Sequence, residues 1–557
     1  MANYLDTVAN IDPTSEIDNP TQANGGTEAY FRFRDYLKSG QSVFFLDTYD
    51  YEQVDAFIKK LYCDLEWKDS YGSVLEYVPG VGGFKSSTKE FISQTFGDSG
   101  AGNVAKTFYD LLFHRGYDEH SMIVVKGANR LFDSTPECAN WVRMIFENNL
   151  YRSRMPVLFV FADVGVEVPV DLVPYSVKMK LPPPKVKRIR ELIDEELSAW
   201  KKKGEWISDK EKAAADRIAD YLIGFSETEV RSVLSYSKQY GDGLYVSEVE
   251  EKVRSAKKEM VERVGTLKLI RKTTDDFAGL ENLREYLKRI GRILKDKKLL
   301  QKNNQRPPKG ILLVGMPGCG KSLCAKAAQG ILDRPLIQLD VGRLLGKYVG
   351  ESERNMRIAL DVAERAAPCI LWIDELEKAF SGMDSSDGTA LRLFGAFLTW
   401  LQENNSDVYV IATANNIDKI PDEFKRRGRF DAIFKTMMPT KDERAAIFKS
   451  HLKKVRQLYC ANNSDEFDTL CRELATATKY TKDDDDGFSG ADINAVVTNA
   501  VWEMVASEAK EVTKDMLKQE IVKLAGKTQR DVMANNYVPM REKLKKSGYA
   551  NASKGKE

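Results

Sequence analysis

Short apolar runs alternate with amphipathic stretches from residue 28 to about residue 185. Apolar residues at helical spacing predict helices over Phe31–Leu37, Tyr51–Leu61 and about 136–149. Four short apolar runs predict strands: Ser42–Leu46, Met122–Val125, Val157–Phe161 and Val177–Leu181. Because helices that separate strands are typical of parallel sheets, we expect an α/β domain.

The pattern changes several times after this domain. Pro182-Pro183-Pro184 ends it, and the sequence up to about residue 265 is charged and helical by periodicity. A second α/β pattern follows, then an all-helical stretch that the acidic run Asp483–Asp486 interrupts. We therefore expect these parts: a flexible arm (1–27), an α/β domain (28–185), a helical subdomain and connector (186–265), a second α/β domain (275–439), a helical domain (440–530), and a C-terminal helix with a basic tail disordered from Tyr549 (531–557).

A glycine-rich loop in the second α/β domain carries the clearest chemistry. The apolar run Ile311–Val314 leads into the sequence GMPGCGKS at residues 315–322, and a helix-forming stretch follows. This is the P-loop pattern, in which backbone N–H groups cradle phosphates and the lysine reaches the β- and γ-phosphates. Such a loop alone could still be a simple chain reversal. We expect nucleotide contacts along it from Gly315, Pro317, Gly318, Cys319, Gly320, Lys321, Ser322 and Leu323.

Paired carboxylates supply a second half of the site. The apolar run Cys369–Ile373 ends in Asp374 and Glu375, which predicts a buried parallel strand with two acids at the carboxyl edge of the sheet. We expect Ser322 and Asp374 to bind Mg²⁺, and Glu375 to polarise the attacking water. Both motifs together favour ATP and Mg²⁺ over the alternative of a core strand that happens to end in solvated acids.

Composition limits the classes of partner and the cellular compartments that we expect. The 557 residues carry 84 Lys and Arg against 83 Asp and Glu, so no global field attracts nucleic acid or an anionic membrane. The seven cysteines are scattered without metal-ligand spacing, and none of the three histidines is paired with them at zinc spacing. The sequence has no transmembrane segment or secretory leader, so we expect a soluble protein in a reducing compartment such as the cytosol or a plastid stroma.

The first α/β domain lacks the same chemistry. Its first strand runs into Asp47-Thr48-Tyr49-Asp50, and the strand at Met122 ends in Lys126-Gly127 without paired acids. The nearest approach to a phosphate loop is Pro79–Ser86, where Phe84 would obstruct the close backbone approach that glycine permits. We read that segment as a turn and the domain as degenerate.

Further motifs, in order, resemble those of the AAA+ ATPases. They are Asp276–Leu280, Gly346–Glu353, Ile411–Asn415, Arg426–Asp431 and Gly487–Asp492. The resemblance covers about residues 275–526 and implies a parallel sheet sandwiched by helices, with a helical lid. The whole layout resembles a narrower group, the hypothetical chloroplast reading frame forty-six proteins. That resemblance implies a degenerate ATPase-like domain with its own helical subdomain, followed by one intact AAA+ module.

The resemblance also implies residue roles. Asn415 is similar to the first sensor. Arg426 and Arg429 are similar to arginine fingers that act on a neighbouring subunit, which implies a homo-oligomer; the alternative is that they form a solvated basic turn. Gly279 on the adenine side, with Gly490 and Ala491 where a second-sensor arginine is lacking, would contact the nucleotide. Lys347, Tyr348 and Val349 are similar to a pore loop that grips polypeptide in a hexamer; the alternative is that Tyr348 packs within its own subunit.

Three functions compete at this point. We favour an ATP-driven remodeller that pulls a protein client or adaptor through the ring. A nucleic-acid-associated ATPase would use Lys347 and other basic residues to follow a phosphate backbone, with steep salt dependence. A nucleotide-gated assembly scaffold would need Lys321 but not Tyr348. The sequence shows no protease or nuclease motif.

Overall fold

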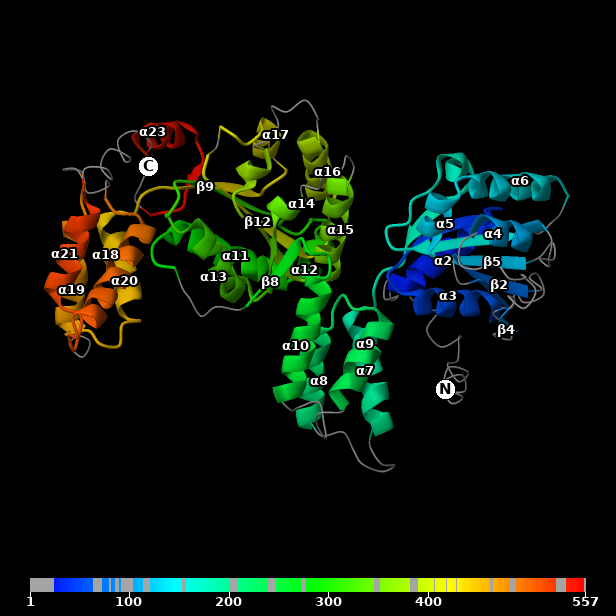
Figure 1. Ribbon diagram of the computed structural model, residues 1–557, viewed down its shortest axis with the longest axis horizontal. Helices are drawn as coiled ribbons and strands as arrows, with labels where there is room; N and C mark the ends of the chain where they lie inside the picture. Colours follow the sequence, from blue (N-terminus) through cyan, green and yellow to red (C-terminus); the bar gives the residue numbers. More distant parts are fainter. Residues whose placement is uncertain are drawn as a thin grey trace. The chain divides into compact units, whose positions relative to one another are not determined.

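The computed structural model of the chain describes most of its residues (Figure 1). The described ranges are 25–63, 73–79, 82–85, 90–91, 104–113, 121–152, 157–200, 209–238, 247–271, 277–344, 351–380, 389–404, 406–416, 418–426, 428–460, 464–480, 487–526 and 537–554. They form two compact units, Met1–Lys257 and Lys258–Glu557, and each is considered by itself. Among the described residues, no helix combines the length and apolar character needed to cross a bilayer.

The N-terminal unit is built on a seven-stranded sheet in the order β4-β3-β2-β5-β6-β1-β7. Its strands are β1 (Val43–Asp47), β2 (Ser73–Val78), β3 (Gly82–Lys85), β4 (Glu90–Phe91), β5 (Ser121–Lys126), β6 (Leu158–Asp163) and β7 (Val177–Lys180). The five strands from β2 to β7 in that order are parallel, as the alternating pattern predicts. β3 pairs antiparallel with β2, so the described part of the Pro79–Ser86 segment is a hairpin strand.

Helices cover both faces of this sheet (Figure 1). They are α2 (Gly25–Lys38), α3 (Tyr51–Cys63), α4 (Val104–Phe113), α5 (Ala128–Ser134), α6 (Glu137–Arg152) and the 3₁₀ helix η3 (Val170–Tyr175). Because strand side chains alternate, Val43 and Phe45 of β1 pack with α4, α5 and α6, whereas Phe44 and Leu46 pack with α2 and α3. Four helices follow: α7 (Val186–Trp200), α8 (Asp209–Tyr221), α9 (Glu227–Lys238) and α10 (Ser247–Glu262).

The C-terminal unit also has a seven-stranded sheet, in the order β14-β13-β9-β12-β11-β10-β8. Its strands are β8 (Leu267–Ile270), β9 (Gly310–Gly315), β10 (Leu336–Leu339), β11 (Cys369–Ile373), β12 (Val408–Ala414), β13 (Ala432–Thr436) and β14 (Ala550–Asn551). Only β8 runs antiparallel to its neighbour among these strands. β8 precedes residue 275, so the unit begins earlier than the sequence indicated.

The helices of this unit divide into two groups. Those around the sheet are α11 (Glu281–Lys295), α12 (Lys297–Lys302), α13 (Lys321–Leu332), α14 (Val341–Leu344), α15 (Glu351–Arg365), the 3₁₀ helix η4 (Leu376–Phe380), α16 (Thr389–Glu403) and α17 (Asp422–Lys425). A separate helical lid comprises α18 (Lys441–Leu452), α19 (Ser464–Ala477), α20 (Gly490–Ala506) and α21 (Lys514–Leu524). The lid has its own apolar core, and Arg444 lies fully buried in it, where Nη1 donates to the Pro439 carbonyl at 2.9 Å.

The C-terminal tail corrects an expectation. We expected disorder from Tyr549 onward, but after α23 (Val538–Lys546) the chain adds β14 to the edge of the sheet beside β13. Ala552 is fully buried, and the Asn282 side chain donates to the carbonyls of Asn551 and Ser553 at 3.1 and 2.9 Å. A small polar composition suggested disorder, but backbone pairing and a tight fit against the core need no large apolar side chains here.

The two units share one architecture. In chain order, the five parallel strands of the N-terminal unit lie second, third, fourth, first, fifth, and strands β9 to β13 lie in the same order. Each unit also starts a helix with Gly-Phe-Ser, at residues 224–226 and 487–489, and both serines belong to capping boxes. The N-terminal unit therefore repeats the sheet and helix arrangement of the C-terminal unit.

Candidate active site

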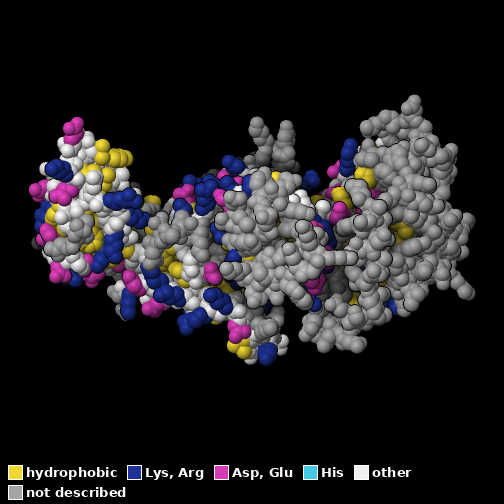
Figure 2. Space-filling view, turned by 90° about the horizontal axis from the view of Figure 1, so that it is seen from below, with side chains coloured by type: hydrophobic (Ala, Val, Ile, Leu, Met, Phe, Trp, Pro, Cys, Tyr) yellow, Lys and Arg dark blue, Asp and Glu magenta, His cyan; other side chains and the backbone are white. Residues whose placement is uncertain are grey.

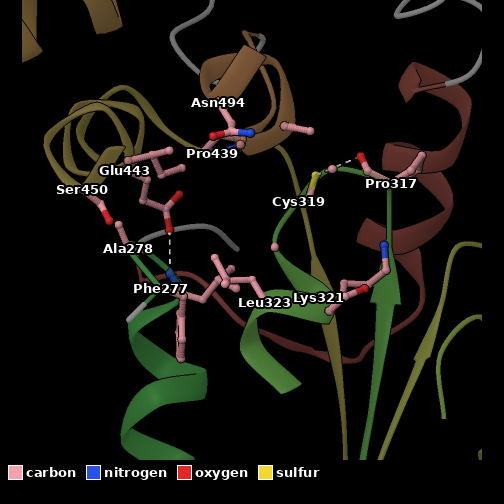
Figure 3. Close-up of a pocket in the computed structure, with 18 of the residues that line it drawn as sticks. Phe277, Ala278, Pro317, Cys319, Lys321, Leu323, Pro439, Glu443, Ser450 and Asn494 are labelled. Carbon is pink, nitrogen blue, oxygen red and sulfur yellow. Dashed lines mark hydrogen bonds between the residues drawn. The ribbon is translucent and has the colours of Figure 1, made fainter. Parts of the chain in front are cut away.

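A cavity of about 590 Å³ lies in the C-terminal unit between the carboxyl edge of the sheet and the lid (Figure 3). It has the size typical of small-molecule sites. The adjacent strands β9, β12 and β11 end at this edge, so the residues that follow them meet there. The predicted residues that line the cavity are Gly279, Pro317, Gly318, Cys319, Gly320, Lys321, Ser322, Leu323, Asp374, Glu375, Asn415, Gly490 and Ala491.

The glycines of the 315–322 loop are required by geometry. Gly318 and Gly320 have φ angles of 79° and 83°, in the left-handed region. A Cβ on Gly318 would lie 2.8 Å from Ser489 Oγ of the lid, and one on Gly315 would lie 2.0 Å from the Thr436 carbonyl oxygen. Gly315 itself lies beneath the loop and does not line the cavity. The loop can therefore pass close to both the lid and β13.

Lys321 lies at the start of α13 and is 6 % exposed. Its Nζ donates to the carbonyls of Gly315 and Met316, at 2.7 Å each. Burial lowers the pKa of this ammonium, because a desolvated charge is less stable. The cation is thus held against the loop whose amides would receive phosphate, and anionic phosphate would offset the cost of its burial.

Ser322 and Asp374 lie side by side as predicted for a metal pair. The Ser322 Oγ is 3.1 Å from Asp374 Oδ1, close to the separation of about 2.9 Å expected for two neighbouring oxygens on octahedral Mg²⁺. Thr413 Oγ1 donates to the same Asp374 oxygen at 2.5 Å and fixes it. Among the described residues, no group of three or more His, Cys, Asp or Glu could hold a metal alone, so nucleotide oxygens and water would complete this shell.

Glu375 is held by residues from two neighbouring segments. Its Oε1 accepts from Asn415 Nδ2 at 2.9 Å, and its Oε2 forms an ion pair with Lys378. The Glu375 backbone has a φ of 51° and its amide donates to Thr413 Oγ1 at 3.0 Å. The backbone amide of Asn415 in turn donates to Glu377 Oε1 at 2.8 Å. The predicted general base and the predicted sensor are therefore in direct contact.

Comparison with protein families identifies this arrangement. Residues 311–437 match the model of the "ATPase family associated with various cellular activities (AAA)", and this range carries the loop, both acids and Asn415. This part of the chain is an AAA ATPase domain.

Several curated proteins resemble almost half of the chain. The "Uncharacterized AAA domain-containing protein ycf46" of Pyropia yezoensis is 41 % identical over 249 residues, which is 44 % of this chain and 47 % of that protein. The "Proteasome-activating nucleotidase" of Methanopyrus kandleri is 31 % identical over 264 residues, 46 % of this chain and 57 % of that protein. The "26S proteasome subunit RPT4" of Saccharomyces cerevisiae is 31 % identical over 260 residues, 45 % of this chain and 56 % of that protein. The chain spans about half the length of the curated relatives it matches.

The predicted arginine fingers lie outside the cavity of their own AAA domain. The Arg426 side chain is 71 % exposed, and its Nη2 lies 3.7 Å from Glu423 Oε1. Arg429 contacts the side chain of Gln402. Asp431 anchors this loop, because its Oδ2 accepts from the backbone amides of Lys309 and Gly310 at 2.7 and 2.9 Å. The predicted pore-loop residues Lys347, Tyr348 and Val349 lie outside the described residues.

The far end of the cavity, opposite the phosphate loop, contains residues that the sequence analysis missed. They are lid residues, among them Glu443, Ile447, His451 and Asn494, and they line the cavity together with Phe277, Leu280 and the predicted Gly279. Figure 3 shows Glu443 and Asn494 of the lid on the same side of the cavity as Phe277. Thr440 and Glu443 form a capping box at the start of α18, and that Thr-x-x-Glu spacing was a readable signal for a helix start. Nothing in the spacing indicated that Glu443 would also reach the body of the AAA domain.

At the corresponding edge of the N-terminal unit, described polar and charged side chains contact one another. Lys126, at the end of β5, is 8 % exposed and forms ion pairs with Asp55 and Glu76 at 2.7 and 2.8 Å. In the loop after β1, Asp50 accepts a hydrogen bond from Thr228 Oγ1. That this unit lacks a working nucleotide site stays a prediction.

Proposed function

We propose that the chain hydrolyses ATP in its AAA domain. The observation that carries this proposal is the meeting of phosphate-binding, metal-binding and base groups in one cavity: Lys321, Ser322, Asp374, Glu375 and Asn415. Lys321 and the loop amides would bind the β- and γ-phosphates. Mg²⁺ bound by Ser322 and Asp374 would neutralise charge on the phosphate oxygens during transfer. Glu375, oriented by Asn415, would accept the proton of the attacking water.

We further propose that catalysis takes place between subunits of a ring. Arg426 and Arg429 do not line the cavity of their own chain, and an exposed arginine on a loop anchored by Asp431 can reach a neighbouring site. A guanidinium there would stabilise the charge that develops on the transferred phosphoryl group.

The client we favour is a polypeptide, gripped by Tyr348 and its neighbours. The names of two relatives refer to the proteasome, a protein-processing assembly, and net charge near zero gives no general attraction for nucleic acid. On the face shown in Figure 2, basic and acidic side chains are interspersed over the lid, without a continuous basic stripe. The six cysteines whose side chains the structure describes are buried and form no disulfides, which suits a reducing compartment such as the cytosol or a plastid stroma.

The first test is the particle mass of Glu375→Gln with ATP and Mg²⁺, measured by mass photometry. This variant should bind nucleotide without turning it over, and a closed hexamer is the expected result. A persistent monomer at micromolar concentration would instead indicate a nucleotide-dependent switch that needs a partner. Mixing Lys321→Ala with Arg429→Ala tests action between subunits, since only that arrangement restores turnover in mixed rings.

The client is tested with the wild-type chain and Tyr348→Ala. Casein, an unfolded protein, should stimulate ATP turnover by the wild type, and single-stranded DNA should not. Tyr348→Ala should bind ATP normally and lose the stimulation by casein. Stimulation by DNA alone, with steep salt dependence, would refute the polypeptide client. Unchanged stimulation in Tyr348→Ala would refute the pore-loop role.

A further inference from the structure

We propose that Glu443 of the lid is a positioning residue that holds the base-binding loop, residues 277–280, and so couples the lid to recognition of the nucleotide base. The inference rests on the proposed ATP site and adds a residue to it. Phosphate and base must lie at opposite ends of the cavity, because Lys321, Asp374 and Glu375 occupy one end. The loop that contains Gly279 faces the lid at the other end.

The carboxylate of Glu443 connects two parts of the fold. Its Oε1 accepts from the Leu280 amide at 3.2 Å, the contact drawn as a dashed line in Figure 3. Its Oε2 accepts from the Thr440 amide at 2.9 Å, at the start of α18. The residue is 7 % exposed, so both hydrogen bonds are shielded from water. A buried carboxylate that accepts hydrogen bonds on both oxygens is costly to disturb.

The loop that Glu443 holds has a backbone that depends on such support. Gly279 and Leu280 have φ angles of 79° and 56°, and the left-handed region is unfavourable for a leucine. The carboxylate also packs closely on Gly279, where a Cβ would lie 3.1 Å from Glu443 Oε1. Without this partner, the Leu280 amide would lose its acceptor and the loop would lose the contact that fixes its conformation.

Binding of the base depends on the position of the lid. Glu443 holds the 277–280 loop only when the lid packs against the body of the domain, so the complete base-binding surface forms only in that arrangement. Conversely, a bound base stabilises the seated lid, because coupling between two sites is reciprocal. The phosphate end does not depend on Glu443, since its contacts come from the loop at 315–322 and from the ends of β11 and β12.

The substitution Glu443→Gln tests this with little change in shape. In glutamine one of the two oxygens becomes an NH₂ group, which donates and cannot accept, so one of the hydrogen bonds from Leu280 and Thr440 is lost. Binding of ATP and of magnesium tripolyphosphate, which has no base, is measured by calorimetry on the full chain. We expect ATP to bind about tenfold more weakly, the effect of one lost charged hydrogen bond, and tripolyphosphate to bind as in the wild type.

Asp442→Asn is the matched control. Asp442 is exposed and does not line the cavity, and its substitution removes the same charge from the same helical turn as Glu443→Gln does. Its binding of both ligands should equal that of the wild type. If Glu443→Gln weakens the binding of ATP and of tripolyphosphate equally, or weakens neither, the inference is wrong but the proposed function stands. A wild-type chain that binds tripolyphosphate but not ATP, or neither, would instead refute the proposed function.

Discussion

Asp50 and Thr228 join the sheet and the helical part of the N-terminal unit. Asp50 follows β1, which holds the same place in its sheet as β9, the strand that precedes the phosphate loop of the AAA domain. Thr228 Oγ1 donates to Asp50 Oδ1 at 2.9 Å, and Asp50 is 5 % exposed. In the C-terminal unit, the start of α20 contacts the phosphate loop through the backbone: the Ala491 amide donates to the Gly318 carbonyl at 3.2 Å. A side-chain contact therefore joins the two parts in the N-terminal unit, whereas a backbone contact beside the cavity joins them in the C-terminal unit.

The first prediction concerns that contact. Asp50→Ala should destabilise the N-terminal unit by about 2 kcal/mol, because it leaves the half-buried hydroxyl and amide of Thr228 without their acceptor. In calorimetry of the full chain, ATP should raise only the transition of the unit that binds it. Asp50→Ala should lower the other transition and leave ATP affinity unchanged. Loss of ATP binding would contradict the view that this unit has no working site.

The second prediction concerns protons. Burial holds the pKa of Lys321 below its ordinary value of 10.5, so the free protein releases this proton at a lower pH than an ordinary lysine does. Bound phosphates favour the ammonium, so ATP binding should take up protons at alkaline pH, and affinity should fall as pH rises through the lowered pKa.

Calorimetry in two buffers of different ionisation enthalpy measures this uptake. Lys321→Arg is the control, because a guanidinium stays charged across the range. Equal alkaline uptake in that variant would assign the proton to another group.

The third prediction concerns Thr413, which is 1 % exposed. Its Oγ1 both donates to Asp374 and accepts from the Glu375 amide, so it holds the metal ligand and the base together. Thr413→Val should lower kcat about 10- to 100-fold, in line with lost supporting hydrogen bonds at metal sites. Thr413→Ser, which keeps the hydroxyl, should retain most activity. Equal activity in the valine and serine variants would show that this hydroxyl has no such role.

The sequence predicted the parts of the site that are local in the chain. Lys321 and Ser322 belong to one contiguous motif, and Asp374 directly follows β11, so the sequence pattern was enough to assign all three to the site. Thr413, Lys378 and Glu443 act through partners that the fold brings to them. A threonine within an apolar strand, or a glutamate that already caps a helix, has a sufficient local explanation, and the sequence pattern does not reveal its second contact.

The last prediction concerns the tail. Ala552 is fully buried, its amide donates to the Lys435 carbonyl at 3.1 Å, and its carbonyl accepts from the Leu283 amide at 3.2 Å. Ala552→Asp would place an unpaired charge in this site and should destabilise the C-terminal unit by about 3 kcal/mol or more. Ala550→Asp, at an exposed position of β14 two residues earlier, should change stability by less than about 0.5 kcal/mol. The ATP-sensitive transition in denaturant reports both variants. A disordered tail would make them equivalent, whereas a strand that completes the sheet makes only the buried position sensitive.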